Sequence, residues 1–315
     1  MSTPNFIYFT DLHLRLTSPK LRTDDIFEAQ LKKLEFITKL SKDLNSEFIL
    51  SGGDFGDSWD WKVSTITTVG NLIKESKILT IVGNHDVPGR NPSLYQSTGI
   101  GLLEWAGALE ILTNNLHQHS RKSDCTFTTR GSFHIVPFHS DTKLTDKLIN
   151  NKLDLDKLVP TDKLRVGVVH APVGDEATEF CKGHKDLEIK GLDICLFGDI
   201  HTGWIPYKSP TGCTLINPGS LTRLTKADMD RKPKVVVIYA DGTFREVEVP
   251  HKPAAKVFNI AKIQKDQDEV GKAFLAAVAR KQVATSINPK EFVQQIGSKA
   301  KYSQASIDLL KEEIQ

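Results

Sequence analysis

The stretch FIYFTDLH, at residues 6–13, decides the fold, because an apolar run is followed at once by an acidic residue and a histidine. The run has the length of a buried strand. Residues 27–44 come next, with apolar side chains every three or four positions, as in an amphipathic helix. Two more apolar runs follow, at residues 48–50 and 78–82, and a second helical stretch lies between them at about residues 62–75. This βαβαβ order predicts parallel strands joined by right-handed crossovers.

The pattern changes after residue 108, where short apolar runs become frequent. The turns Arg130-Gly131 and Asp241-Gly242 each separate two such runs, which predicts two hairpins. Further strands are expected at residues 164–169, 194–197, 213–216 and 235–239. Many strands with helices on only some connections predict an α/β fold of two stacked sheets flanked by helices.

Composition changes again near Pro250. Residues 251–315 hold eleven Lys or Arg against seven Asp or Glu, a net charge of +4, whereas the whole chain of 315 residues carries +2. We therefore expect a main domain over residues 1–250 and a small helical C-terminal extension over residues 251–315, which binds a partner or DNA. Two apolar stripes in it fit a partner surface or packing on the protein's own core equally well; they are Phe274, Leu275 and Val278, and Ile307, Leu310 and Ile314.

Overall composition excludes some classes of protein. A net charge of +2 excludes a uniformly basic nucleic-acid coat, although a local patch remains compatible with it. No apolar run is long enough to span a bilayer, so we expect no membrane association. The first residues enter a strand without a signal peptide, and the four cysteines are scattered. These features predict a cytoplasmic protein with reduced thiols, in the host cytoplasm if a phage encodes it.

Metal-ligand residue types follow five of the predicted strands. In an open α/β sheet, ligands bind beyond the carboxyl ends of the strands. The residues in question are Asp11 and His13, Asp54, then Asn84, His85 and Asp86, then His170, and finally Asp199 and His201. Each motif alone is weak, because Gly-Asp and Asn-His are common turn dipeptides and a lone histidine is often a core residue. Their joint occurrence, each after a strand, predicts a metal site.

The mixture of carboxylate, imidazole and amide oxygen discriminates among metals. It suits Mn²⁺, Fe²⁺ or Zn²⁺ better than the all-oxygen cage typical of Mg²⁺ or Ca²⁺. Cysteine is absent from the set, which argues against a structural zinc site. Without His85 and Asp86, seven candidate ligands remain, which are enough for two divalent ions. Two such ions can clamp the attacking and leaving oxygens of an in-line displacement. Asp54 is the natural bridge, because each of its two oxygens can bind one ion.

His85 and Asp86 are the candidate catalytic residues. His85 follows the candidate ligand Asn84, so it can approach a substrate without being bound to metal itself. An imidazolium there can stabilise charge on a phosphate or protonate the leaving oxygen. Asp86 is placed to orient it, as carboxylates commonly orient catalytic histidines.

Taken together, these motifs resemble the calcineurin-like metallophosphoesterase superfamily over roughly residues 5–240. The resemblance implies a four-layer α/β/β/α sandwich that hydrolyses phosphoesters with two divalent metal ions. It implies that one ion is held by Asp11, His13, Asp54 and His201. The other would be held by Asp54, Asn84, His170 and position 199, with His85 as the catalytic histidine.

One position departs from the family pattern. The family usually has Gly-His-x-His, whereas this chain has Gly198-Asp199-Ile200-His201. Asp199 either ligates the second metal through its carboxylate, which favours Mn²⁺ or Mg²⁺ over Zn²⁺, or leaves that site weak. We favour ligation, because an unpaired carboxylate near the cluster is otherwise poorly placed. Mn²⁺ is therefore the expected metal, with Mg²⁺, Fe²⁺ and Zn²⁺ as alternatives.

Within the superfamily, residues 22–29, 52–55 and 217–220 are similar to the nuclease subunit of the SbcCD-type DNA repair complex, and phage-type relatives are close in length. This implies an exo/endodeoxyribonuclease that acts in DNA repair, recombination or replication with an SMC-like ATPase subunit. DNA and that subunit are the expected partners, and a homodimer stays open. The alternatives are a stand-alone phosphodiesterase or phosphatase for nucleotides or phosphoproteins, and a metal-binding scaffold with little catalysis.

The segment after residue 217 carries the candidate substrate-binding residues. Asn217, Ser220 and Arg223 belong to or follow the Asn-Pro-Gly-Ser turn, and more basic residues come next. Such a loop either contacts DNA phosphates beside the metals or is simply a solvated loop. Three tryptophans near the metal motifs either stack on a base or pack under the loops; they are Trp59, Trp61 and Trp204.

Overall fold

The computed structural model describes residues 3–114, 116 and 125–261. The chain divides into two compact units, Met1–Phe258 and Asn259–Gln315. The second unit lies almost wholly outside the described residues, and the helices and apolar stripes predicted beyond residue 261 fall there. In the described part of the chain, no helix is long and apolar enough to cross a membrane.

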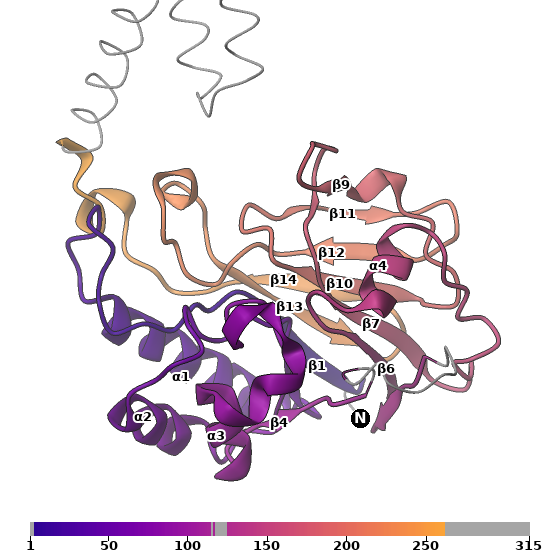
Figure 1. The fold of residues 1–315 in the computed structure, drawn as a ribbon, viewed down its shortest axis with the longest axis horizontal. Helices are drawn as coiled ribbons and strands as arrows, with labels where there is room; N and C mark the ends of the chain where they lie inside the picture. Colours follow the sequence, from indigo (N-terminus) through magenta and orange to yellow (C-terminus); the bar gives the residue numbers. More distant parts are fainter. Residues whose placement is uncertain (1–2, 115, 117–124, 262–315) are drawn as a thin grey trace, which may run out of the picture. The chain divides into compact units, whose positions relative to one another are not determined.

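The first sheet has six strands in the order β14-β13-β1-β2-β3-β4 (Figure 1). Strands β1 to β4 are parallel, which confirms the predicted βαβαβ start, and β13 joins β1 antiparallel. The hairpin predicted about Asp241-Gly242 is present as β13 and β14. The strands are β1 (Asn5–Phe9), β2 (Ile49–Ser51), β3 (Ile78–Thr80), β4 (Glu110–Ile111), β13 (Lys234–Tyr239) and β14 (Phe244–Glu248).

The second sheet also has six strands, in the order β11-β12-β10-β7-β6-β5. Its four central strands are parallel, and its two edge strands are antiparallel to their neighbours. The edge strand β11 was not predicted. The strands are β5 (Thr128–Arg130), β6 (Phe133–Phe138), β7 (Leu164–His170), β10 (Ile194–Gly198), β11 (Trp204–Lys208) and β12 (Thr214–Asn217). A separate small sheet pairs β8 (Val173–Gly174) with β9 (Lys182–Gly183).

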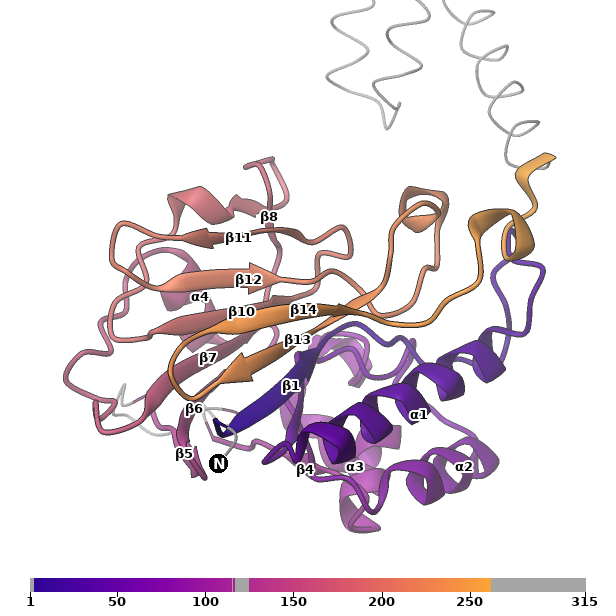
Figure 2. The same ribbon diagram turned by 180° about the vertical axis from the view of Figure 1, so that it is seen from behind.

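Helices cover the outer faces of both sheets, as Figures 1 and 2 show from opposite sides. Three of them lie against the first sheet and one against the second. The longest begins at the side-chain cap of Asp25, which accepts a hydrogen bond from the Glu28 amide and so satisfies a free helix donor. The α-helices are α1 (Ile26–Leu44), α2 (Val63–Ile73), α3 (Gly99–Trp105) and α4 (Lys143–Ile149). Short 3-10 turns lie at Pro88–Arg90, Pro92–Ser97, His184–Asp186, Lys226–Asp228 and Ala254–Lys256.

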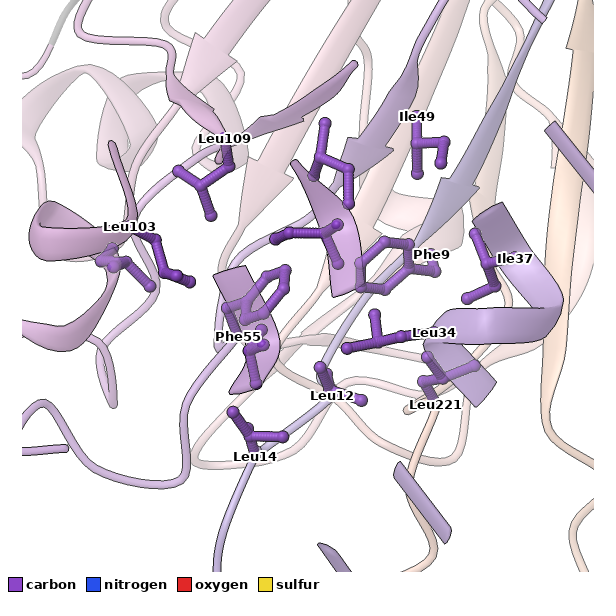
Figure 3. Packing of buried hydrophobic residues seen from close by; sticks show 14 of the residues in the cluster. Phe9, Leu12, Leu14, Leu34, Ile37, Ile49, Phe55, Leu103, Leu109 and Leu221 are labelled. Atoms are coloured by element: carbon purple, nitrogen blue, oxygen red, sulfur yellow. The ribbon is translucent and has the colours of Figure 1, made fainter. Parts of the chain in front are cut away.

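Strand β1 shows how the sequence produces the layers, because its side chains alternate between two apolar clusters. Phe6 and Tyr8 pack between the two sheets, whereas Ile7 and Phe9 face the helices. Figure 3 shows Phe9 beside residues of α1 on the helix side. A third cluster lies between the second sheet and α4. The four-layer α/β/β/α sandwich predicted from the sequence is therefore confirmed.

The same architecture brings the carboxyl ends of both parallel sets to one edge. His170, the last residue of β7, contacts the carbonyl of Gly52 just after β2, although the two belong to different sheets. It also pairs in register with Gly198, the last residue of β10. Loops that leave β1, β2, β3, β7 and β10 therefore meet in one place.

Candidate metal centre

Unusual backbone conformations mark the loops at this edge. Asp11, His13, Asp54 and Asp199 have φ angles of 52°, 46°, 47° and 85°. Residues with a side chain seldom adopt positive φ, because Cβ then crowds the backbone. Such strain persists where the surrounding structure enforces it, and it is concentrated at functional sites. Four of the predicted ligand residues share this feature.

The first donor cluster joins the loops after β1 and β10. Ligand atoms of Asp11, His13 and His201 all lie within 4.8 Å of one another. The two imidazole Nε2 atoms of the histidines are 2.8 Å apart, and Asp54 Oδ2 is 3.8 Å from the nearer one, that of His13. This is the set of residues that the family resemblance assigns to one metal ion.

The second donor cluster is built around His170, which is buried. Its Nδ1 lies 2.8 Å from the carbonyl oxygen of Gly52, which can only accept, so Nδ1 carries a proton there. That hydrogen bond leaves Nε2 facing the cluster, 3.0 Å from Asn84 Oδ1 and 3.3 Å from Asp54 Oδ2. A backbone contact that fixes the ring in this way is typical of histidines that ligate metals.

Asp54 connects the two clusters. Its Oδ2 lies between His13 and His170, whereas its Oδ1 accepts a hydrogen bond of 2.8 Å from the His85 amide. One oxygen, rather than one for each ion, therefore faces both clusters. Gly83 permits this placement, because a Cβ there would lie 2.2 Å from Asp54 Oδ1.

The charges of this centre are unbalanced. Among the described residues, no ion pair joins a Lys or Arg to Asp11, Asp54 or Asp199, and the ion-pair partners of these three carboxylates are histidines. Burial, followed by the neighbouring carboxylate of Asp54, raises the pKa of Asp11 to about 6, despite the opposing effect of His170. Burial would raise the pKa of Asp54 as well, but the charge of His170 outweighs it and the pKa is lowered.

The histidines respond to the same environment. Burial lowers the pKa of His13 to about 3. Burial also acts to lower the pKa of His170, but the carboxylate of Asp54 outweighs it and the pKa rises well above its usual value. Without metal, His170 therefore keeps a proton where a cation would otherwise balance the carboxylates. A buried group of acids and imidazoles that needs positive charge fits two divalent ions.

Asp199 lies beside the second cluster. Its amide donates to both carboxylate oxygens of Asp11, at 3.2 Å each, and its own Oδ1 is 3.7 Å from His170 Nε2. Burial raises the pKa of its carboxyl group. The side chain is 24% exposed, so it lies at the mouth of the site rather than inside it. Ligation by Asp199 is compatible with this position and remains a prediction.

His85 is exposed at the same mouth, and its ring centroid is 4.9 Å from that of His13. Its Nδ1 contacts the carbonyl of Asp57 at 2.9 Å. Asp86 does not orient this ring, contrary to the prediction, because its oxygens accept from the amides of Gly56 and Gly83 at 2.9 and 3.0 Å. Asp86 is buried and positions the two loops, whereas Asp57 is the residue that meets the histidine.

The sequence did not indicate the role of Asp57, although this residue follows Asp54 by three positions in the stretch Gly53-Asp54-Phe55-Gly56-Asp57. Its carboxylate lies 3.9 Å from His13 Nδ1 and 3.0 Å from the Arg15 guanidinium. His13 Nδ1 is a buried atom without a hydrogen-bond partner. A second acidic residue three positions after Asp54 is the signal that could have identified this position.

The candidate substrate residues after β12 need a correction. Asn217 and Ser220 are fully buried, and their side chains bond to backbone atoms of this and the neighbouring loops. Arg223 is 4% exposed and donates to the carbonyls of Met229 and Lys252. These three residues hold the loops together, so their placement contradicts direct contact with a substrate.

Two of the three tryptophans pack rather than face a ligand. Trp61 lies against Gly99 and Phe55, and its ring nitrogen donates to Ser58. Trp204 is 8% exposed and stacks on His184 with ring centroids 5.0 Å apart. Trp59 is 40% exposed, and base stacking by it remains a prediction.

The comparison with known protein families agrees with this geometry. The family model described as calcineurin-like phosphoesterase matches residues 4–203. No curated protein matches the sequence. Among solved structures, the sulfate thiohydrolase SoxB of Thermus thermophilus, in complex with glycerol, is similar at 13% identity and a TM-score of 0.42. The match covers 79% of this chain and 57% of SoxB, so this chain spans less than two thirds of that enzyme.

Proposed function

The chain belongs to the calcineurin-like phosphoesterase family, and on that premise we propose that it is a two-metal phosphodiester hydrolase whose substrate is DNA. The observation that carries the proposal is the position of Asp54 Oδ2 between His13 and His170, which links two donor clusters through one atom. Family membership makes the protein a metal-dependent hydrolase of phosphoesters. DNA as the substrate and Mn²⁺ as the metal are the finer parts of the proposal.

The ligand assignment follows the family resemblance, and the described donor groups support its core: Asp11 with His13 and His201, and Asp54 with His170. Asp11, His13, Asp54 and His201 would hold one ion, and Asp54, Asn84, His170 and Asp199 the other. When bound, two divalent ions polarise a phosphoryl oxygen and lower the pKa of a water molecule.

His85 carries the acid–base step of the proposed reaction. The carbonyl of Asp57 holds its Nδ1, which leaves Nε2 to exchange a proton with a substrate oxygen. The ring is exposed, so a leaving oxygen can approach it from solvent. Protonation of that oxygen by His85 would allow the phosphoester bond to break without an unstable alkoxide.

Support for DNA as the substrate comes from the motif similarity and the open site. Asp199 and His85 are both solvent-accessible, so a long polymer can approach the centre from the side. We further propose an SMC-like ATPase as the partner, with residues 251–315 as the contact, although most of that segment lies outside the described residues.

The test is an assay of the purified protein with Mn²⁺ on end-labelled single- and double-stranded DNA, beside the chromogenic diester bis(p-nitrophenyl) phosphate. The proposal predicts loss of labelled DNA and turnover of the diester, both abolished by EDTA and restored by Mn²⁺. Turnover of the diester with intact DNA would favour the stand-alone phosphodiesterase. Inactivity on both substrates in Mn²⁺, Mg²⁺, Fe²⁺ and Zn²⁺ would contradict the proposal and favour a binding scaffold.

A further inference from the structure

A cavity of about 420 Å³ begins one residue beyond the candidate ligand His201. One wall is the chain from Thr202 to Pro206, and the other side includes Asn217 and Pro218. Three basic residues also line it: Arg231, Lys232 and Lys234. We call this space the Arg231 cavity. No residue assigned above to the metals or to the acid–base step lines it.

Arg231 is tied to the same turn that supports His201. The Ser220 amide donates to the His201 carbonyl at 2.9 Å, and Arg231 Nη2 in turn donates to the carbonyl and hydroxyl oxygens of Ser220. A Cβ on Gly219 would lie 2.9 Å from Arg231 Nη1 and 2.5 Å from the His201 carbonyl, so the guanidinium lies close to the turn. The cation is therefore a direct neighbour of the metal-site backbone.

Two donors of this guanidinium have no partner. Nε and Nη1 of Arg231 are buried atoms without a hydrogen bond, and the ion pairs of the described residues include none made by Arg231. Burial lowers its pKa to about 10, so the group stays charged at neutral pH. Buried donors are rarely left unsatisfied in a native protein, and an unpaired buried one calls for an acceptor from outside. Carboxylate and phosphate oxygens are the acceptors whose geometry matches a guanidinium, and a phosphate is the one that a strand of nucleic acid would bring.

The two neighbouring lysines differ from Arg231 in this respect. Lys234 pairs with Glu246 at 2.5 Å, and Lys232 pairs with Glu248 at 3.3 Å while its side chain stays 66% exposed. Lys232 can therefore swing toward an anion at low cost, because an exposed ion pair is weak. The cavity is thus lined by one fixed cation, whose two unpaired nitrogens are buried, and by one exposed cation that can move.

We propose that the Arg231 cavity binds a second phosphate of the substrate strand, next to the phosphate that is cleaved at the metals. The inference rests on the proposed function and narrows it to a substrate with at least two linked phosphates, that is, a nucleic acid strand. Ile205, which is 87% exposed on the cavity wall, gives an apolar surface for the sugar or base between those phosphates. The basic residue that recognises the strand is then Arg231 rather than the buried Arg223.

The test compares Arg231→Gln, Arg231→Lys and Lys232→Gln with a matched control, Lys157→Gln, in which an exposed lysine on another loop is changed. Binding of a fluorescein-labelled single-stranded oligodeoxythymidine is measured by anisotropy in Mn²⁺ over a salt series. The measurement uses a His85→Ala background so that the DNA stays intact. Metal content and thermal melting are recorded for every variant.

The proposal predicts that Arg231→Gln weakens binding about tenfold, because a charge-assisted hydrogen bond is lost. It predicts a fall of about one in the slope of log K against log salt, because one phosphate contact disappears. Arg231→Lys keeps the slope, Lys232→Gln gives a smaller loss in affinity, and Lys157→Gln gives none. In the parent with His85 intact, the same Arg231→Gln change raises the KM for the oligonucleotide more than the KM for bis(p-nitrophenyl) phosphate.

Two results would overturn the proposal. One is an unchanged affinity and salt slope in Arg231→Gln. The other is a loss of bound metal in that variant, which would mean that Arg231 only supports the His201 turn. If Arg231→Gln does not melt cooperatively, the test rests on Lys232→Gln. Parental DNA affinity in Lys232→Gln would then show that the Arg231 cavity does not bind the strand. Failure of the proposed function gives a different result: the parent protein then leaves the DNA intact, with or without turnover of the diester, whereas the binding series still reports on the cavity.

Discussion

The amino and carboxyl ends of the parallel strands differ in how their acidic side chains are paired. At the amino ends, acidic and basic side chains pair: Arg165 contacts Asp193 at 2.8 Å, and Arg130 contacts Glu110. At the carboxyl ends, three carboxylates gather without a Lys or Arg among the described ion pairs. Both ends follow from the same sheets, so topology alone does not explain the contrast. In the described part of the chain, these three carboxylates lack the Lys or Arg partners that the acidic residues at the amino end have.

Backbone geometry shows the same contrast. Asp11, His13, Asp54 and Asp199 hold positive φ at the carboxyl edge. At the amino edge, Arg165 and Asp193 are joined both through their side chains and by an amide hydrogen bond of 2.8 Å. Strain and unbalanced charge both raise the free energy of the folded state, and the carboxyl edge combines the two, although Asn45, Asp141 and Asn151 also have positive φ elsewhere. A protein that retains them there uses them, and bound metal ions would relieve the charge.

The largest expected effect comes from removing the acid–base group while leaving the ligands in place. His85→Ala should lower kcat for bis(p-nitrophenyl) phosphate about 10²–10⁴-fold, the usual contribution of a positioned general acid. Mn²⁺ content should stay at the parental value, because His85 is not among the assigned ligands. The control is His251→Ala, which changes another histidine at a distance in sequence from every metal motif. Full activity in His85→Ala would reject the catalytic assignment.

A steric change beside Asp54 should have a smaller effect, a loss of metal affinity at the carboxyl ends of the strands. In Gly83→Ala, the new Cβ would lie 2.2 Å from Asp54 Oδ1 and 2.3 Å from the Asp54 backbone nitrogen, so the carboxylate between the clusters and its loop must move. We expect Mn²⁺ affinity to fall about 10–100-fold, as is common when the support of a ligand is altered. Gly70→Ala, within α2, is the control, because its Cβ meets Leu103 only at 3.3 Å. Isothermal titration would measure the Mn²⁺ affinity of both variants. Parental affinity in Gly83→Ala would show that metal binding does not depend on the room that Gly83 leaves for Asp54.

How far the sequence predicts this site depends on the kind of chain that carries each residue. Asp11, His13, Asp54 and His170 follow regular strands, so periodicity and the strand-end rule place them correctly. Arg223 lies in an irregular loop, where no period indicates the direction of a side chain, and it proved to be buried. The prediction that Asp86 orients His85 was wrong for a related reason. Adjacency in sequence suggested a contact with His85, but the turn directs its carboxylate to the amides of Gly56 and Gly83.

Acidity should weaken the metal site specifically. The pKa of Asp11 is raised to about 6 and that of His170 is raised as well, so both groups must release protons before metal binds. Apparent Mn²⁺ affinity should therefore rise with pH, by about tenfold per unit for each proton displaced, and fall as pH drops below 6. Titration calorimetry in buffers of different ionisation enthalpy counts those protons. An affinity that is flat between pH 5 and 8 would contradict the metal-free charge state described here.

The smallest effect is expected at the amino ends. Arg165→Gln removes a pair whose acidic partner is 38% exposed, so solvent already screens it. We expect a loss of no more than about 1 kcal/mol in the free energy of unfolding, and no change in kcat or metal content. Urea denaturation and the diester assay measure these. A large loss of activity would mean that the two ends are coupled.

The central claim is that the unpaired acids hold two metal ions. Titration of the metal-free protein with Mn²⁺, checked by elemental analysis of the loaded protein, tests it most directly. The account predicts two ions per wild-type chain, and in Asp199→Ala it predicts one tightly bound ion with the second weakened or lost. A single ion in the wild type, or two equally tight ions in Asp199→Ala, would contradict the account of two unequal sites bridged by Asp54.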